Sequence, residues 1–179
     1  MKTLLSRFAL AAILSCASLT GHAQTVQNGP YYAQPSWDQQ LPASTRFIVL
    51  SNWNIEAVLD RETGLVWERQ PLPSKSNWSS SFLSCHGRFV GNRMGWRLPS
   101  VSEVTSLLDP TQSNPALPAG HPFDRLTVEP IFWTASTDES DNGLAYVVQF
   151  DQAALAFEPK DQVLRRWCVR GGTEVPYSP

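Results

Sequence analysis

The sequence predicts an α+β domain with two helices and short, mostly antiparallel strands. Apolar residues recur at the spacing of an amphipathic helix at Trp78, Phe82, Cys85 and Phe89. Strand-forming segments separated by turn residues fill the chain from position 131 onward. Helices in the first half and strands in the second half are typical of the α+β class.

A capping box predicts the start of the second helix at Ser100. The Ser100 hydroxyl can accept a hydrogen bond from the backbone N–H of Glu103, whose carboxylate can reach back to the N–H of Ser100. Pro99 disfavours helical backbone at the residue before it. Apolar residues at helical spacing follow, and Asp109-Pro110 is expected to end the helix.

The strands are predicted from composition and turn residues. Residues 46–50 form a candidate first strand, and residues 57–60 and 65–68 form a hairpin whose loop ends in Gly64. Further strands are expected at residues 131–135, 144–150, 153–157 and 163–169. The Pro-rich residues 112–128 carry little helix or strand signal, and such long loops are often functional, so they are one candidate binding surface.

Composition and charge indicate a folded domain and argue against two classes of protein, nucleic-acid binders and proteins with a transmembrane helix. The chain has 179 residues, of which 42% are hydrophobic and 17% charged, and it contains seven Trp, so it can bury a sizeable core. The formal net charge is −2 and no long basic run is present, which argues against a nucleic-acid partner. No apolar stretch is long enough to predict a transmembrane helix.

The first residues predict export. Lys2 and Arg7 precede the apolar residues 8–14, and small residues lead to a cleavage site after Ala23, the pattern of a secretory signal peptide over residues 1–23. A lipobox-like sequence ending at Cys16 is an alternative that predicts lipidation. Both patterns predict an exported protein that is periplasmic, secreted or at the cell surface. Residues 24–45 are expected to be a flexible lead-in, residues 46–172 the domain and residues 173–179 a tail.

Removing the signal peptide leaves two cysteines, Cys85 and Cys168. Two cysteines in an exported chain most often form a disulfide. The competing hypothesis is a reactive Cys85 with the adjacent His86 as its base. Neighbours on a helix point about 100° apart, which places His86 badly for that role.

Five groups of residues, in chain order, resemble the C-terminal domain family of the Legionella collagen-like adhesin, which has a C-type-lectin-like fold. They are residues 60–67 (DRETGLVW), Trp78 with Cys85, residues 95–99 (GWRLP) with Glu103, residues 132–136 (FWTAS) and residues 167–170 (WCVR). The resemblance covers about residues 46–172. It implies a disulfide-closed, lectin-like domain that is used for recognition rather than for chemistry.

The resemblance also marks residues with an expected structural role: Trp67, Trp96, Arg97, Pro99, Glu103 and Trp133. The large indoles, that of Trp167 included, are expected in the core. Arg97 is expected to pair with a carboxylate or with backbone carbonyls, and a contact to an anionic ligand is the alternative. The calcium-binding Glu-Pro-Asn motif of sugar-binding lectins is missing, because Ile131 follows Glu129-Pro130.

Arginines near the two cysteines are candidate ligand-binding residues: Arg88, Arg93, Arg165, Arg166 and Arg170. If the disulfide forms, several of them come close together and predict a basic patch for sulfated or carboxylated glycans. Scattered, solvated charges are the alternative. Trp53 lies in a loop-like segment and is the candidate for stacking on a sugar ring.

Calcium is the one cofactor for which the sequence offers candidate ligands. Asp138, Glu139, Asp141 and Asn142 lie within five residues and offer oxygen ligands, although a polar turn before Gly143 explains them equally well. Phosphate-loop, H-E-x-x-H and G-x-S-x-G motifs are missing, so no catalytic residue is assigned. The sequence therefore predicts a non-catalytic recognition module for a glycan or another extracellular ligand. A structural or protein–protein interaction module of the cell envelope is the alternative.

Overall fold

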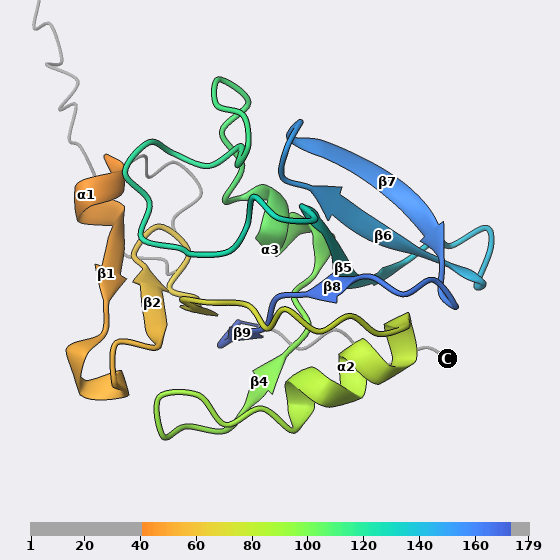
Figure 1. Ribbon diagram of the computed structural model, residues 1–179, viewed down its shortest axis with the longest axis horizontal. Helices are drawn as coiled ribbons and strands as arrows, with labels where there is room; N and C mark the ends of the chain where they lie inside the picture. The colour runs from red at the N-terminus through yellow and green to blue at the C-terminus, as the bar shows by residue number, and fades with distance from the viewer. Residues whose placement is uncertain (1–40, 173–179) are drawn as a thin grey trace, which may run out of the picture.

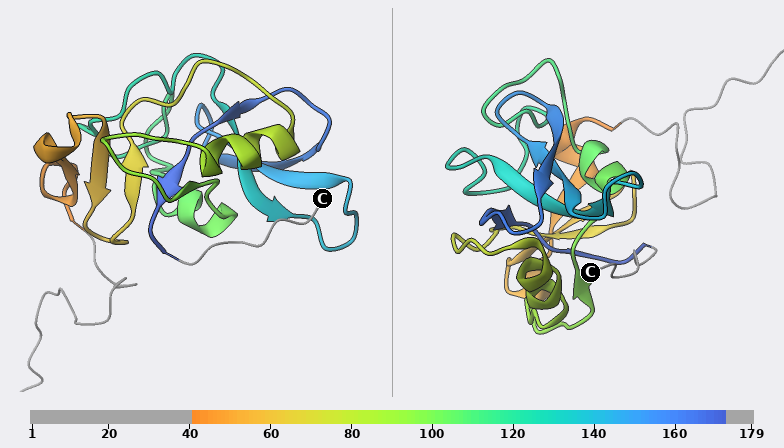
Figure 2. Two further views of the ribbon diagram at one scale, coloured as in Figure 1. Left: turned by 90° about the horizontal axis from the view of Figure 1, so that it is seen from below. Right: turned by 90° about the vertical axis from the view of Figure 1, so that its right-hand side faces the viewer.

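The computed structural model describes residues 41–172, which form an α+β domain with two sheets and a few short helices (Figure 1). In chain order the elements are α1 (Ala43–Arg46), β1 (Phe47–Val49), η1 (Ser51–Trp53), β2 (Ala57–Asp60), β3 (Val66–Glu68), α2 (Trp78–His86), β4 (Trp96–Arg97), α3 (Val101–Thr105), β5 (Ile131–Thr137), β6 (Leu144–Gln149), β7 (Ala154–Pro159), β8 (Arg165–Arg166) and β9 (Val169–Arg170). The hairpins β1–β2 and β6–β7 lie at opposite ends of the molecule (Figures 1 and 2).

The first sheet has the strand order β1-β2-β3-β9-β4, and each neighbouring pair is antiparallel. The predicted hairpin of β2 and β3 is confirmed, with Val58 opposite Trp67. Its turn is held by Asp60, whose carboxylate accepts from the Glu62 N–H at 3.0 Å and from the Thr63 hydroxyl at 2.9 Å. The turn closes at Gly64, whose φ of 72° suits a residue without a Cβ.

The second sheet has the order β7-β6-β5-β8, in which β5 and β8 are parallel and the other pairs antiparallel. The single strand predicted over residues 163–169 is wrong. β8 pairs with β5, whereas β9 pairs with β3 and β4 in the other sheet. Between them the chain crosses from one sheet to the other, with Trp167 and Cys168 both buried.

The predicted amphipathic helix is α2, and it is capped by Asn77, whose side-chain oxygen accepts from the Ser80 N–H at 2.9 Å. Trp78, Phe82 and Cys85 form its buried face. The helix ends at His86 with Gly87 as its C-cap, so Phe89 lies outside it and is 62% exposed, contrary to the sequence prediction. The apolar spacing continued by coincidence past the residue at which the helix stops.

The capping box at Ser100 is confirmed, and α3 begins directly after it. The helix ends at Thr105, earlier than the predicted stop at Asp109-Pro110. The reason is that Leu107 and Leu108 donate to carbonyls three residues back, at 3.0 Å each, so the chain turns more tightly there than an α-helix does.

The folded domain begins before residue 46, the residue at which the sequence predicted that it starts. The Leu41 N–H donates to Glu62, and the four-residue helix α1 follows. Its last residue, Arg46, is buried and forms an ion pair with Asp60 at 2.9 Å. The predicted signal peptide, Cys16, residues 24–40 of the lead-in and the 173–179 tail lie outside the described residues.

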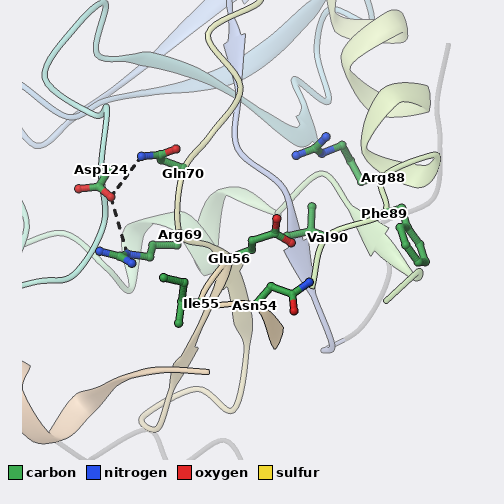
Figure 3. Close-up of a pocket in the computed structure, with 9 residues that line it drawn as sticks. All are labelled: Asn54, Ile55, Glu56, Arg69, Gln70, Arg88, Phe89, Val90 and Asp124. Atoms are coloured by element: carbon green, nitrogen blue, oxygen red, sulfur yellow. Dashed lines mark hydrogen bonds and ion pairs between the residues drawn. The ribbon is translucent and has the colours of Figure 1, made fainter. Parts of the chain in front are cut away.

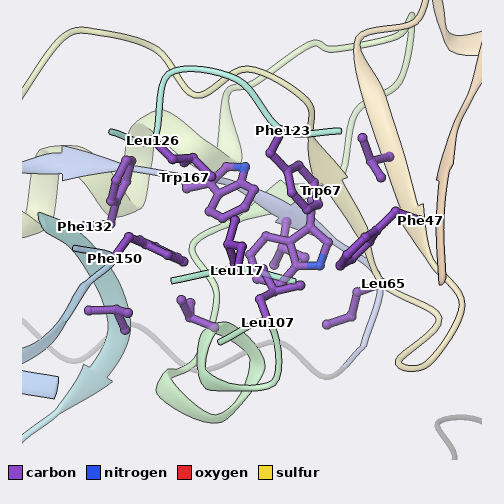
Figure 4. Packing of buried hydrophobic residues seen from close by; sticks show 14 residues of the cluster. Phe47, Leu65, Trp67, Leu107, Leu117, Phe123, Leu126, Phe132, Phe150 and Trp167 are labelled. Atoms are coloured by element: carbon purple, nitrogen blue, oxygen red, sulfur yellow. The ribbon is translucent and has the colours of Figure 1, made fainter. Parts of the chain in front are cut away.

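Buried side chains form two clusters. One joins Trp67 and Trp167 to the phenylalanines of both sheets (Figure 4). The other surrounds Trp78, Trp96 and Trp133 and contains the two cysteines. These five indoles are at most 1% exposed.

The predicted disulfide is confirmed between Cys85 and Cys168, which fixes the end of α2 to the segment between β8 and β9. The nearby Arg97 is buried, and its guanidinium donates to both carboxylate oxygens of Glu103, at 2.8 and 2.6 Å. Arg97 also donates from Nε to the Gly171 carbonyl at 3.1 Å. The arginine therefore ties β4 to the helix α3 and to the chain after β9.

The Pro-rich residues 112–128 contain no helix or strand, as the sequence predicted. Three of their larger apolar side chains, Leu117, Phe123 and Leu126, nevertheless belong to the core. Val128 is 67% exposed and remains accessible to a partner. Among the described residues, no helix is long and apolar enough to cross a membrane.

Candidate binding site

A hollow of about 440 Å³ lies where four loops meet (Figure 3). One loop precedes β2, the second follows β3, the third follows α2, and the fourth is the Pro-rich loop. The nine residues around it are Asn54, Ile55, Glu56, Arg69, Gln70, Arg88, Phe89, Val90 and Asp124. Most of them carry polar groups, which a ligand rich in hydrogen-bonding groups would need.

Asp124 is the acceptor on one side of the hollow. Gln70 donates to its carboxylate at 3.3 Å, and Arg69 lies 3.7 Å from the same oxygen. Backbone bonds fix this group, because the Arg69 N–H donates to the Glu56 carbonyl at 2.8 Å and the Asp124 N–H to the Arg69 carbonyl at 3.0 Å. The side chains of Arg69 and Asp124 are 33% and 45% exposed, so a ligand can reach both.

Arg88 lines another side of the hollow and is held from behind by Glu68. The Arg88 Nε donates to a Glu68 carboxylate oxygen at 2.6 Å, and the Cys168 N–H donates to the other oxygen at 3.0 Å. Glu68 is only 1% exposed, whereas the Arg88 side chain is 22% exposed. The buried carboxylate thus positions a partly exposed guanidinium at the hollow, next to the disulfide.

Burial raises the pKa of Glu68 above its ordinary value of 4.5, and the nearby Arg88 opposes this only in part. The folded protein therefore holds this proton more tightly than the unfolded chain does. The protonated carboxyl contributes stability that is fully present below pH 4.5 and is lost as the pH rises through the raised pKa.

A Glu68→Gln variant tests this pH dependence, because glutamine does not titrate. The wild-type free energy of unfolding is expected to fall relative to that of the variant as the pH rises above 4.5. Urea denaturation of both proteins across the acidic range measures the difference. A difference that stays constant with pH would show that Glu68 has the same pKa in the folded and unfolded chain.

Trp53 lies beside the hollow with two arginines against its ring. The guanidinium carbons of Arg93 and Arg170 are 5.3 and 5.4 Å from the ring centroid, within the range of cation–π interaction. Trp53 is half-buried against Trp96, in an edge-to-face contact with centroids 6.4 Å apart. The structure therefore brings together Trp53, Arg93 and Arg170 of the predicted ligand-binding set, with Arg88 at the adjacent hollow.

Two of the five candidate arginines, Arg165 and Arg166, do not contribute to an exposed basic patch, because they are buried, at 3% and 7% exposure. Arg165 donates to the carbonyls of Arg125 and Val128 and thereby anchors the Pro-rich loop. Arg166 donates to the Ser74 carbonyl at 3.3 Å. Both lie on β8, a buried edge strand of the second sheet that the sequence pattern had placed in one long strand.

The acidic segment considered for calcium forms a turn in which Asp138 and Asp141 accept hydrogen bonds from the turn's own residues. Asp138 accepts from the N–H and hydroxyl of Ser140 at 2.9 Å each, and Asp141 accepts from the Gly143 N–H at 2.8 Å. Glu139 and Asn142 are exposed. Within residues 41–172, no three His, Cys, Asp or Glu side chains are grouped so that they could hold a metal ion. The calcium hypothesis rests on the sequence alone.

Sequence reasoning missed the centre of the hollow, which is formed by Glu56, Arg69, Gln70 and Asp124. These residues are separated by up to 68 positions and belong to no motif, so nothing in the sequence grouped them. One signal was present: residues 69–102 contain five Lys or Arg and no Asp or Glu. That stretch supplies Arg69 and Arg88 to the site.

The model of the Lcl C-terminal domain family matches residues 56–170. The chain belongs to this family. The match includes every residue of the hollow except Asn54 and Ile55, and it ends at Arg170 beside Trp53. A comparison with curated proteins finds no match.

Proposed function

We propose that this protein is an exported, non-catalytic recognition module that binds a glycan or another extracellular ligand in the hollow. The observation that carries the proposal is the grouping of Arg69, Gln70, Asp124 and Arg88 around one accessible space. Charged and amide groups offer both donors and acceptors, which suits the hydroxyl and carboxylate groups of a saccharide. Trp53 beside the hollow adds an aromatic surface.

Export and a C-type-lectin-like fold are parts of the same proposal. The disulfide supports export, because such bonds persist mainly in oxidising compartments. The signal-peptide pattern of residues 1–23 points the same way. The family, the two small sheets and the disulfide that links α2 to the last strands agree with a lectin-like arrangement.

The absence of catalysis is proposed from the placement of the ionisable groups. Glu68 is the carboxyl with a raised pKa near the hollow, but it is buried and bonded to Arg88 and to the backbone of Cys168. His121 is half-buried, and burial lowers its pKa. Its Nδ1 accepts from the Phe123 N–H at 3.2 Å. Both groups stabilise local structure, so neither is offered as a general acid or base.

A glycan array tests the proposal, with the exported protein in calcium and again in EDTA. The wild type is expected to bind, and an Arg69→Ala/Gln70→Ala variant is expected to bind at least about tenfold more weakly, since two direct contacts of about 1 kcal/mol each are lost. Binding that disappears in EDTA would assign the recognition to a metal. Binding that survives EDTA would assign it to the side chains of the hollow.

A matched control uses the same residue types elsewhere. Arg61 and Gln112 are exposed, and Arg61 lies in the turn at the far end of β2. An Arg61→Ala/Gln112→Ala variant is expected to bind as the wild type does. Equal losses in both variants, or no saccharide binding by the wild type, would count against the hollow as a glycan site.

The alternative function, a protein–protein interaction module of the envelope, is favoured by one separate observation. β7 is an edge strand of the second sheet, and its Leu155 and Phe157 are 46% and 42% exposed. Edge strands offer unpaired backbone groups to another chain. Capture of an envelope protein that a Phe157→Lys change abolishes, together with silence on the array, would favour this function.

A further inference from the structure

Residues 88–94 form a tight turn between α2 and β4, here named the tip hairpin. Val90 and Arg93 exchange both backbone hydrogen bonds, at 3.2 and 3.0 Å. The two residues between them, Gly91 and Asn92, have φ angles of 60° and 59°. Positive φ at both central residues is what a two-residue type I′ hairpin turn requires. In Figure 1 this turn extends outward below the first sheet.

The tip hairpin carries two adjacent apolar side chains in water. Phe89 and Met94 flank the bonded pair, so they lie across from each other and share the face opposite to Val90 and Arg93. Phe89 is 62% exposed and Met94 is 66% exposed, whereas Val90 is buried. Figure 3 shows Phe89 at the edge of the hollow, pointing away from it.

The tip hairpin is held rigidly against the domain. A Cβ on Gly91 would lie 2.7 Å from the Cβ of Trp53, so the backbone packs directly on this side chain. The Gly91 N–H donates to the Glu56 carboxylate at 2.8 Å, and Trp96 Nε1 donates to the Arg93 carbonyl at 2.9 Å. Because these contacts fix the turn, Phe89 and Met94 stay outside the core.

Two arginines lie behind this apolar pair, against Trp53. Arg93 and Arg170 stack on Trp53, and within the described residues neither forms an ion pair with a carboxylate. The Arg170 Nε donates to the Met94 carbonyl at 2.8 Å, so this guanidinium lies next to the tip. Of the two carboxylates bonded near the tip, the exposed Glu56 accepts from the Gly91 N–H, and the buried Glu68 pairs with Arg88.

We propose that the tip hairpin docks the protein onto an anionic phospholipid bilayer. Phe89 and Met94 enter the interfacial layer, and Arg93 and Arg170 meet the phosphate groups of the lipids. This goes beyond the proposed function, because the hollow keeps its own ligand. Complementary charge favours an anionic bilayer as the occupant. A folded protein partner is disfavoured, because two side chains on a narrow turn cover far less than the roughly 800 Å² that each side of a specific interface buries.

Co-sedimentation with vesicles tests the proposal, using protein purified from the exported fraction and checked by mass for any lipid. The vesicles contain phosphatidylcholine with an increasing share of phosphatidylglycerol. The wild type is expected to bind more strongly as this share rises. Phe89→Ser/Met94→Ser is expected to weaken binding at least about tenfold, and Arg93→Gln about fivefold.

A matched control moves the same kind of change to another surface. Leu155 and Val163 are also exposed apolar residues, at 46% and 58%, and they lie in β7 and in the loop after it. A Leu155→Ser/Val163→Ser variant is expected to bind vesicles as the wild type does. Thermal unfolding of each variant is measured first. A melting temperature close to that of the wild type confirms that the variant folds.

Three outcomes would overturn the proposal: no vesicle binding by the wild type, binding that ignores phosphatidylglycerol, or equal losses in the control variant. Binding of an anionic polysaccharide but not of vesicles, lost in the Phe89/Met94 variant, would assign the tip to saccharides instead. Phe89 also lines the hollow, whereas the glycan-array variant changes Arg69 and Gln70 and leaves the tip hairpin intact, so that variant tests the hollow alone.

Discussion

Replacing Cys85 and Cys168 together by alanine is expected to lower the free energy of unfolding by about 4 kcal/mol. The disulfide joins residues 83 positions apart, and a cross-link over so long a loop removes many conformations from the unfolded chain. Both cysteines are buried, at 0% and 1% exposure, so the two alanines also remove some packing from the folded state. The larger part of the loss is expected from the unfolded state, which regains the conformations that the cross-link excluded.

Urea denaturation of the oxidised wild type and of the double variant measures this effect. The unfolding midpoint is expected to fall, and the dependence of the unfolding free energy on urea is expected to steepen, because an unlinked chain exposes more surface. Wild-type protein that has been unfolded and refolded under reducing conditions should match the variant. An unchanged midpoint would mean that the bond does not constrain the unfolded chain.

Trp167→Ala is expected to cost roughly 3–5 kcal/mol of unfolding free energy. The indole contacts four aromatic rings, those of Trp67, Phe123, Phe132 and Phe150, with centroids between 4.9 and 6.3 Å away. Its Nε1 also donates to the Glu68 carbonyl at 2.7 Å. Alanine leaves a cavity where the two sheets meet and removes the partner of a buried carbonyl.

Two controls separate the sources of this loss. Trp167→Phe keeps much of the ring contact but removes the Nε1–H, so it is expected to cost less than alanine and to report the hydrogen bond. Trp53→Ala removes an indole that is only half-buried and is expected to have a smaller effect on stability. Thermal and urea unfolding of the three variants measure the order. Equal losses at positions 53 and 167 would contradict the assignment of Trp167 to the core.

The sequence determined the features that depend on neighbouring residues. The capping box at Ser100 is complete within four residues, and the turn after Asp60 is held by the Asp60 carboxylate, which accepts from the Glu62 N–H and the Thr63 hydroxyl. The buried stripe of α2 followed from its helical spacing, and the cysteine pair followed from the two cysteines that remain beyond the predicted signal peptide. Local hydrogen bonds and chain statistics are sufficient for such predictions.

The tertiary structure alone decided which charged residues are accessible. Arg165 and Arg166 resemble the other arginines in the sequence, yet β8 lies inside the fold and their guanidinium groups bond to backbone carbonyls there. The hollow combines residues from four distant loops, among them Arg69 and Asp124. Burial and long-range contacts depend on how the two sheets pack, and no local pattern records that packing. The exposure of Phe89 and Met94 could not be predicted for the same reason. Only the end of α2 and the turn at Gly91 place these two side chains in solvent.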